Sequence, residues 1–158
     1  MFGATAAGLA FGTAGTAAAH AVQYPVGAMT HTAHGAGVAV MMPYVMEFNR
    51  GYCEPELAEI GQAMGLDIKT ASLEQQADAT IDAVAALFAD IGIPRTIADL
   101  GVTSAQLPQV AEQAMGSARL IKNNPRPLEL ETMKILVEAS FGGNRDGLRA
   151  DSRLRKAS

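Results

Sequence analysis

The first 46 residues contain no Asp, Glu, Lys or Arg, and this feature limits the fold more than any other. All 28 residues of these four types lie in the remaining 112 positions. A charge-free stretch is typical of a secretory signal, of a membrane span, or of helices that are buried on all sides. These three interpretations differ in what they require of the residues within the stretch.

The segment Gly3–Val22 favours the third interpretation. No basic region precedes it, and it is longer than the apolar part of a signal peptide. It consists mostly of Ala, Gly and Thr and contains His20, so membrane insertion gains little free energy. We therefore expect a helix buried inside a larger helical body, and no membrane partner. Because chain termini usually lie at the surface, this chain is expected to begin inside a domain.

Helical periodicity and the lack of alternating patterns predict an all-α fold. Ser72 and Gln75 fit a capping box, and Pro43 is expected to end or bend its helix. Gly8, Gly12 and Gly15 are expected to let a neighbouring helix approach closely. The expected helices cover residues 2–23, 34–49, 54–64, 73–91, 104–120 and 128–141, with loops at 25–32 and 123–127. The expected domain covers residues 1–142, and residues 143–158 form a loose Arg-rich tail whose arginines are solvated or border a partner.

Composition excludes several classes of function. The net charge of −4 argues against a nucleic-acid partner, and 5% aromatic residues with no Trp argue against base stacking. The single cysteine, Cys53, rules out an internal disulfide and favours a reducing, cytoplasmic compartment. The sequence has no dinucleotide fingerprint after a strand and no phosphate-binding loop.

The three histidines, His20, His31 and His34, all lie in the charge-free stretch. An imidazole in apolar surroundings is either a hydrogen-bonded core residue or a metal ligand. His20 and His34 are able to meet across a helix–loop–helix turn, whereas His31 shares a face with His34 only if both are helical. Zinc and iron sites take at least three protein ligands, and no carboxylate precedes Glu47. The residues alone therefore indicate half of a metal site.

Several segments resemble the iron-containing (group III) alcohol dehydrogenases. They are Gly-Leu-Ala-Phe at 8–11, the run from His20 to Gly27, His-Gly at 34–35, Pro43, Glu-Phe-Asn at 47–49, Gly-Ile-Pro-Arg-Thr at 92–96, Leu-Gly-Val at 100–102 and Asn-Pro-Arg-Pro at 124–127. The resemblance covers roughly residues 1–142. It implies an N-terminally truncated helical bundle like the C-terminal, metal-binding domain of that family, within the dehydroquinate synthase-like superfamily.

The resemblance also implies roles for particular residues. His20 and His34 match two ligands of Fe²⁺ or Zn²⁺, whose other ligands in the family are an Asp and a His on an earlier helix. Tyr24 stands where many relatives carry a second histidine implicated in proton relay. A phenol ordinarily titrates near pH 10 and is a poorer proton carrier at neutral pH. Phe11 matches an aromatic residue of the substrate pocket, although a core position explains it equally well.

The activity that the resemblance implies is oxidation of an alcohol to an aldehyde or ketone, with hydride transfer to NAD or NADP. The expected partners are a small alcohol or aldehyde substrate and an N-terminal cofactor domain that this sequence lacks. An apolar face left open by missing helices also predicts a homo-oligomer or aggregation. The alternative is a non-catalytic helical module for partner binding or oligomerisation, or an inactive remnant.

Overall fold

The computed structural model describes residues 1–151, and every regular element in that range is helical. The predicted all-α class is therefore confirmed. The elements are α1 (Phe2–Ala14), α2 (Ala18–Thr30), α3 (His34–Asn49), η1 (Arg50–Tyr52), α4 (Glu54–Ala63), α5 (Leu73–Asp90), η2 (Ser104–Gln106), α6 (Leu107–Met115), α7 (Ala118–Lys122), α8 (Leu130–Gly142) and α9 (Arg145–Ala150).

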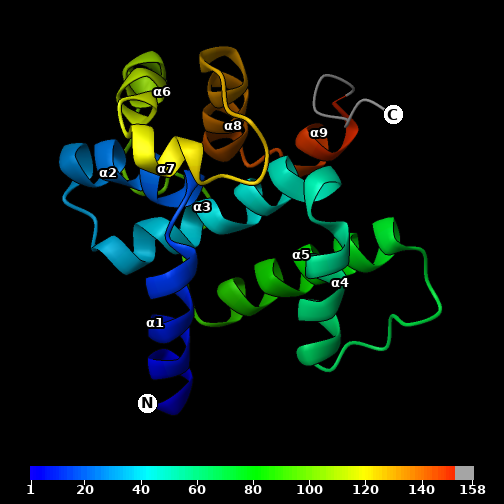
Figure 1. The fold of residues 1–158 in the computed structure, drawn as a ribbon. Helices are drawn as coiled ribbons and strands as arrows, with labels where there is room; N and C mark the ends of the chain where they lie inside the picture. Colours follow the sequence, from blue (N-terminus) through cyan, green and yellow to red (C-terminus); the bar gives the residue numbers. More distant parts are fainter. Residues whose placement is uncertain (152–158) are drawn as a thin grey trace.

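Helix α3 runs through the middle of the molecule, with α6 and α8 on one side and α5 on the other (Figure 1). Its large apolar side chains Met41, Tyr44 and Phe48 are almost fully buried in the main core. Helices α2, α6 and α8 supply most of the remaining core residues. A smaller cluster around Leu57 and Ile81 holds α4 against α5. The two ligand candidates on α2 and α3 are therefore carried by the best-packed part of the chain.

Several predicted boundaries are confirmed. Helix α3 has the predicted limits and continues past Pro43, which neither ends nor interrupts it. Ser72 and Gln75 form the predicted capping box at the start of α5. Residues 123–127 are a loop between α7 and α8. The helix expected over residues 104–120 is instead divided into η2, α6 and α7, and its capping residue is Thr103.

The single helix expected over residues 2–23 is wrong. Helix α1 ends at Ala14, and the next residue, Gly15, has a φ of +79°, in the left-handed region that favours glycine. The Asn123 side chain fixes this break, because its Nδ2 donates to the carbonyl oxygens of Ala14 (2.9 Å) and Thr16 (3.1 Å). The loop expected over residues 25–32 is also wrong, because α2 continues through Pro25 to Thr30.

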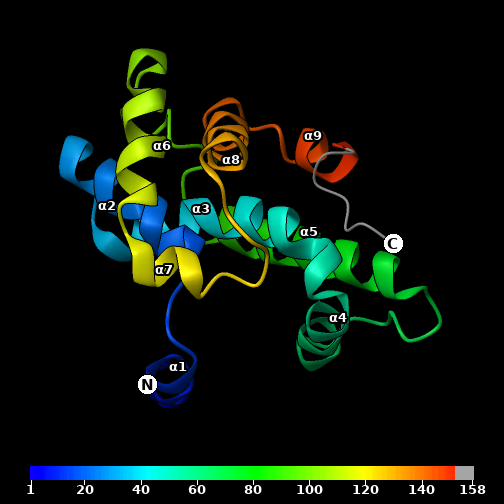
Figure 2. The ribbon, with the colours of Figure 1, turned by 45° about the horizontal axis from the view of Figure 1, so that its top comes forward.

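Helix α1 contradicts the expected burial of the charge-free stretch. None of its residues is buried, and Phe2, Leu9 and Phe11 are exposed. Both views show α1 projecting from the helical body (Figures 1 and 2). A Cβ added at Gly8 or Gly12 would meet no atom within 4 Å, so neither glycine serves a close approach of helices within residues 1–151. No helix in this range is both long enough and apolar enough to cross a bilayer.

The expected loose tail is in part a packed helix. Helix α9 buries Leu148 against the core and lies beside α3. Arg149 donates to the buried carboxylate of Glu47, and Arg145 lies 3.0 Å from Asp82 on α5. These two arginines therefore join α9 to α3 and α5, which corrects the expectation that they are only solvated. Residues 152–158 of the expected tail lie outside the described residues.

Candidate metal centre

Helices α2 and α3 form a hairpin that brings His20 and His34 together. The hairpin is closed by residues 31–33, and the two imidazole ring centroids lie 5.1 Å apart with an interplanar angle of 57°. His20 is half-buried and His34 is exposed. The two rings thus meet across the turn, as their spacing indicates.

His31 does not join this pair into a larger cluster. It lies at the C-terminus of α2 with a φ of +57°, an uncommon backbone conformation for a residue other than glycine. Its backbone N–H donates to the carbonyl oxygen of Gly27 at 2.9 Å, and its side chain is exposed. Within residues 1–151, no group of three or more His, Cys, Asp or Glu side chains is arranged to hold a metal ion. The described chain therefore presents two imidazole donors.

Gln23 is a contributor to the site that the sequence analysis missed. Its side chain is only 4% exposed, and its Oε1 lies 2.8 Å from Nδ1 of His34. An amide oxygen only accepts hydrogen bonds, so Nδ1 of His34 carries the proton of this bond, and Nε2 is the atom left for a metal in the neutral ring. Metal-binding histidines typically donate their second ring N–H to an oxygen in this way. Gln23 therefore holds His34 in the tautomer suited to a metal.

Two glycines provide the space that Gln23 occupies. A Cβ on Gly27 would lie 2.6 Å from Nε2 of Gln23, and a Cβ on Gly37 would lie 2.8 Å from Cγ of the same side chain. Both distances are shorter than packed side chains allow. The signal in the sequence is Gln23 within the charge-free stretch, with one glycine four residues after it and another three residues after His34.

Both histidines border an open cavity of about 700 Å³ with mainly apolar walls. This volume is typical of small-molecule sites. Phe11 from α1 and Phe88 from α5 contribute to the walls, together with Met42 of α3. Phe11 is 58% exposed, so it is not a core residue, and it borders the same cavity as the two imidazoles.

Tyr24 lies beside the histidine pair but outside this cavity. Its ring centroid is 6.1 Å from that of His34, and the two rings are nearly parallel, at 26°. The side chain is 46% exposed and borders a smaller hollow of about 240 Å³ formed with Ser117 and Arg119 of the α7 region. The phenol is therefore in contact with solvent and stacked on one candidate ligand.

The electrostatic surroundings favour the neutral form of His20. Burial lowers the pKa of His20, and the positive charges of His34 and Arg119 lower it further. A neutral imidazole has the lone pair that a metal requires. Burial raises the pKa of Cys53 to about 11, with the negative charges of Glu56 and Glu54 adding to the shift. The Cys53 thiol therefore stays protonated at neutral pH and is a poor metal ligand.

Comparison with known proteins identifies the family of the chain. The fold and the site define a helical domain with a two-histidine donor pair at the mouth of an apolar cavity. The chain belongs to the family described as Fe-containing alcohol dehydrogenase, C-terminal, which it matches over residues 1–141. The resemblance that the sequence analysis found is thereby confirmed.

Individual relatives match in the same region. The chain is 35% identical over 141 residues to long-chain-alcohol dehydrogenase 1 from Geobacillus thermodenitrificans, covering 89% of this chain and 36% of that protein. It is 33% identical over 135 residues to lactaldehyde reductase from Escherichia coli, covering 85% of this chain and 35% of that protein. The solved alcohol dehydrogenase from Oenococcus oeni is 28% identical, with a TM-score of 0.81 over 85% of this chain and 35% of that chain. The chain thus spans about a third of the length of these curated relatives.

Proposed function

We propose that the chain is the metal-binding part of a cytoplasmic, NAD(P)-dependent alcohol dehydrogenase that interconverts an alcohol and an aldehyde or ketone. The observation that carries this proposal is the contact of the His20 and His34 rings, with Gln23 bonded to Nδ1 of His34. Membership of a family named for its iron supports the same assignment. The chain spans about a third of each relative, and we assign the NAD(P) site to the portion that it does not span.

His20 and His34 fit a divalent metal, Fe²⁺ or Zn²⁺, because the two rings lie together at the edge of one cavity, the pKa of His20 is lowered, and Nδ1 of His34 is bonded to Gln23. Such an ion supplies Lewis acidity toward the oxygen of the alcohol. Two imidazoles alone bind weakly, because zinc and iron sites take three or more protein ligands. We assign the remaining ligands to the unmatched portion as well.

The other residues of this chain act around the histidine pair. Phe11 and the apolar walls of the cavity hold the carbon chain of the substrate and exclude water from it. The hydroxyl of Tyr24 is open to solvent and stacked beside His34, so it is placed to carry a proton between the site and the medium. Gln23 orients His34 and does not touch the substrate.

The proposal is tested by metal binding to the purified 158-residue chain. Titration calorimetry with Zn²⁺ should show weak binding that is abolished in both His20→Ala and His34→Ala. His31→Ala is the matched control and should bind like the wild type, because His31 stands apart from the pair. Equal binding in His20→Ala and the wild type would contradict the proposal. Tight stoichiometric binding by the wild type would contradict the assignment of further ligands to another portion.

A second series of variants tests the role of Gln23. Gln23→Leu removes the acceptor at Nδ1 of His34 and is expected to weaken Zn²⁺ binding about tenfold or more. Gln23→Glu keeps an acceptor oxygen and should retain most of the affinity. A loss of equal size in both variants would show that Gln23 matters only for packing.

A non-catalytic module for partner binding or oligomerisation is the second candidate, and α1 is the observation that favours it. Phe2, Leu9 and Phe11 expose apolar surface on one projecting helix. This alternative predicts that sedimentation changes when Leu9 is replaced by Glu and stays constant in His20→Ala. The first proposal predicts that NAD-dependent alcohol oxidation appears when the N-terminal portion of long-chain-alcohol dehydrogenase 1 is added, and that this activity requires both histidines.

A further inference from the structure

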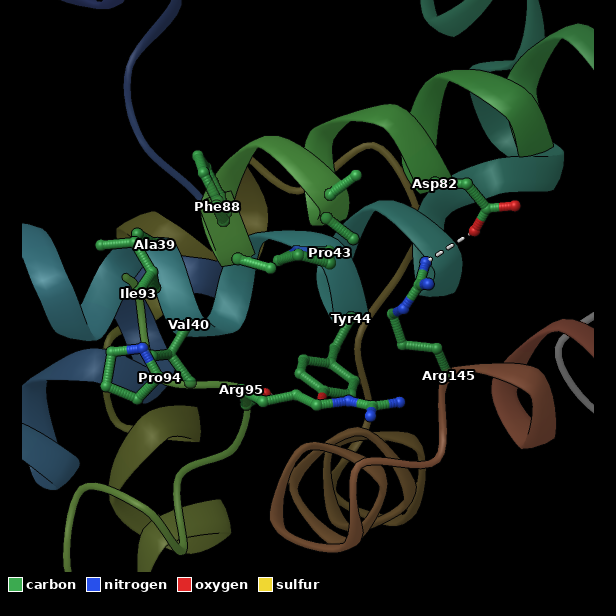
Figure 3. Close-up of a pocket in the computed structure, with 13 residues that line it drawn as sticks. Ala39, Val40, Pro43, Tyr44, Asp82, Phe88, Ile93, Pro94, Arg95 and Arg145 are labelled. Atoms are coloured by element: carbon green, nitrogen blue, oxygen red, sulfur yellow. Dashed lines mark hydrogen bonds and ion pairs between the residues drawn. The ribbon is translucent and has the colours of Figure 1, made fainter. Parts of the chain in front are cut away.

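A second pocket, here called the arginine pocket, lies between α3, α5 and the loop that follows α5 (Figure 3). Its volume of about 340 Å³ is at the lower end of the range for small-molecule sites. Only Ala39 and Phe88 border both this pocket and the histidine cavity. The walls are mainly apolar and include Pro43, Ala85, Ala86, Phe88, Ile93 and Pro94. The proposed dehydrogenase chemistry makes no use of this pocket.

Two guanidinium groups lie at one end of the arginine pocket. Arg145 enters from the start of α9, and Arg95 enters from the loop after α5 and extends past Tyr44 toward the Arg145 side (Figure 3). Arg145 is paired with Asp82 at 3.0 Å. Among residues 1–151, no acidic side chain forms an ion pair with Arg95, which is exposed. The pocket therefore carries one positive charge that the described chain leaves uncompensated.

Tyr44 lies close enough to both arginines for their charges to act on its hydroxyl. Burial raises the pKa of Tyr44, and the positive charges of Arg95 and Arg145 oppose that shift, while the negative charge of Asp99 adds to it. The Tyr44 hydroxyl donates to the backbone carbonyl oxygen of Arg95 at 2.7 Å. This bond ties the loop that carries Arg95 to α3, so the backbone of Arg95 is fixed beside the pocket before any ligand arrives.

We propose that the arginine pocket binds a small organic acid with an apolar body. The planar fork of Arg95 matches the two oxygens of a carboxylate, and the apolar walls cover an aromatic or branched aliphatic group. Inorganic anions would leave those walls without a partner. Asp82 also lies on the pocket wall, and its negative charge selects a singly charged acid over a dianion such as a phosphate monoester.

The test uses the full chain with benzoate as the probe and benzamide as its uncharged counterpart. Ligand-observed NMR titration in metal-free buffer should show saturable binding of benzoate and much weaker binding of benzamide. Arg95→Gln is expected to weaken benzoate binding about tenfold. Arg119→Gln is the matched control, because Arg119 lies near His20 and Tyr24 and outside the arginine pocket. It should leave benzoate binding unchanged.

A second variant distinguishes binding inside the arginine pocket from a non-specific attraction of anions to the charge of Arg95. Ala86 is exposed and lines the pocket, so Ala86→Phe fills the pocket without burying a larger side chain in the core. It should abolish benzoate binding while Arg95 is still present. The proposal is overturned by equal affinity in Arg95→Gln and Arg119→Gln, or by benzoate binding that survives Ala86→Phe. It is also overturned if neither benzoate nor isovalerate binds saturably to the wild type.

Discussion

Helices α1 and α3 come from the same charge-free stretch and have opposite environments. No residue of α1 is buried, whereas nine residues of α3 are, and α2 between them buries seven. The apolar content of α1 is mostly alanine, while α3 carries Met41, Tyr44 and Phe48 at spacings that share one face. The absence of charge permits burial, but large apolar side chains on one face determine which helix is buried.

The free energy gained by burying side chains differs between α1 and α3 in the same way. Burying a large apolar side chain contributes roughly 1.5–3 kcal/mol, whereas an alanine removes little area from water. Helix α3 therefore gains stability from several buried side chains at once. Helix α1 has few side chains whose burial would offset the conformational entropy lost on ordering them. The following predictions test what burial on α3 and exposure on α1 contribute, beginning with the largest expected effect.

Phe48→Ala should lower the free energy of unfolding by about 3–5 kcal/mol, because it leaves a cavity in the core beside α3. Leu9→Ala on α1 should change it by less than about 0.5 kcal/mol, because Leu9 is exposed. Urea unfolding followed by circular dichroism measures both. A large loss in Leu9→Ala would show that α1 is covered by another copy of the chain in solution.

Glu47, the first charged residue of the chain, shows that α3 also buries a charge where a partner is present. Its carboxylate is fully covered and accepts from Arg149 of α9. Arg149→Met leaves this carboxylate without its main partner and should cost about 3 kcal/mol near neutral pH. Lys134→Met, which removes a partner of the exposed Glu131, is the control and should have little effect.

This loss should depend on pH in a stated direction. Burial raises the pKa of Glu47, and the hydrogen bond from Arg149 opposes the shift, so removing Arg149 raises the pKa further. A carboxyl group whose pKa is higher in the folded than in the unfolded state takes up a proton on folding. The free energy of unfolding therefore rises as the pH falls toward the pKa of the unfolded state. Part of the loss in Arg149→Met should therefore be recovered in urea titrations at about pH 5. A loss that is equal at both pH values would contradict this account.

Replacing a glycine by alanine in α3 and in α1 gives the smallest expected effects and compares the two helices directly. Gly37→Ala on α3 forces a Cβ to within 2.8 Å of Cγ of Gln23 and should cost about 1–3 kcal/mol. Gly8→Ala on α1 meets no atom within 4 Å and should raise helix stability by about 0.5–1 kcal/mol. Thermal unfolding of the two variants should shift in opposite directions. Two shifts of the same sign would mean that the helices do not differ as described.

The sequence predicted α3 to the residue, because turn-forming residues precede His34 and the Asn-Arg-Gly run at 49–51 marks the end of the helix. The same rules failed for α2, where Pro25 and Gly27 indicated a loop. Proline and glycine disfavour helix locally, but tertiary packing overrides propensity, and Pro25 and six other residues of α2 are buried. Gly27 also makes room for Gln23, a requirement that no local pattern shows.

The part of the candidate site that follows from the order of the helices along the chain was predictable. The part that depends on how the helices pack against each other was not. The contact of the two imidazoles follows from a short turn between their helices. The bond from Gln23 to His34 depends on how α2 and α3 cross, which sequence spacing does not give. The pair of Glu47 and Arg149 joins residues that are 102 positions apart, so no local signal exists for it. The metal-binding roles of the histidines stay predictions.

The short closure between α2 and α3 has a consequence for how an ion would be captured. Both imidazoles belong to one hairpin, closed by residues 31–33, and need no distant segment to find each other. Binding of an ion to the first ring makes the second encounter intramolecular, at a high effective concentration. Under the proposed metal-binding role, the hairpin would be a bidentate chelator contained in one contiguous stretch of sequence, and it would be inherited, moved or lost as a single piece.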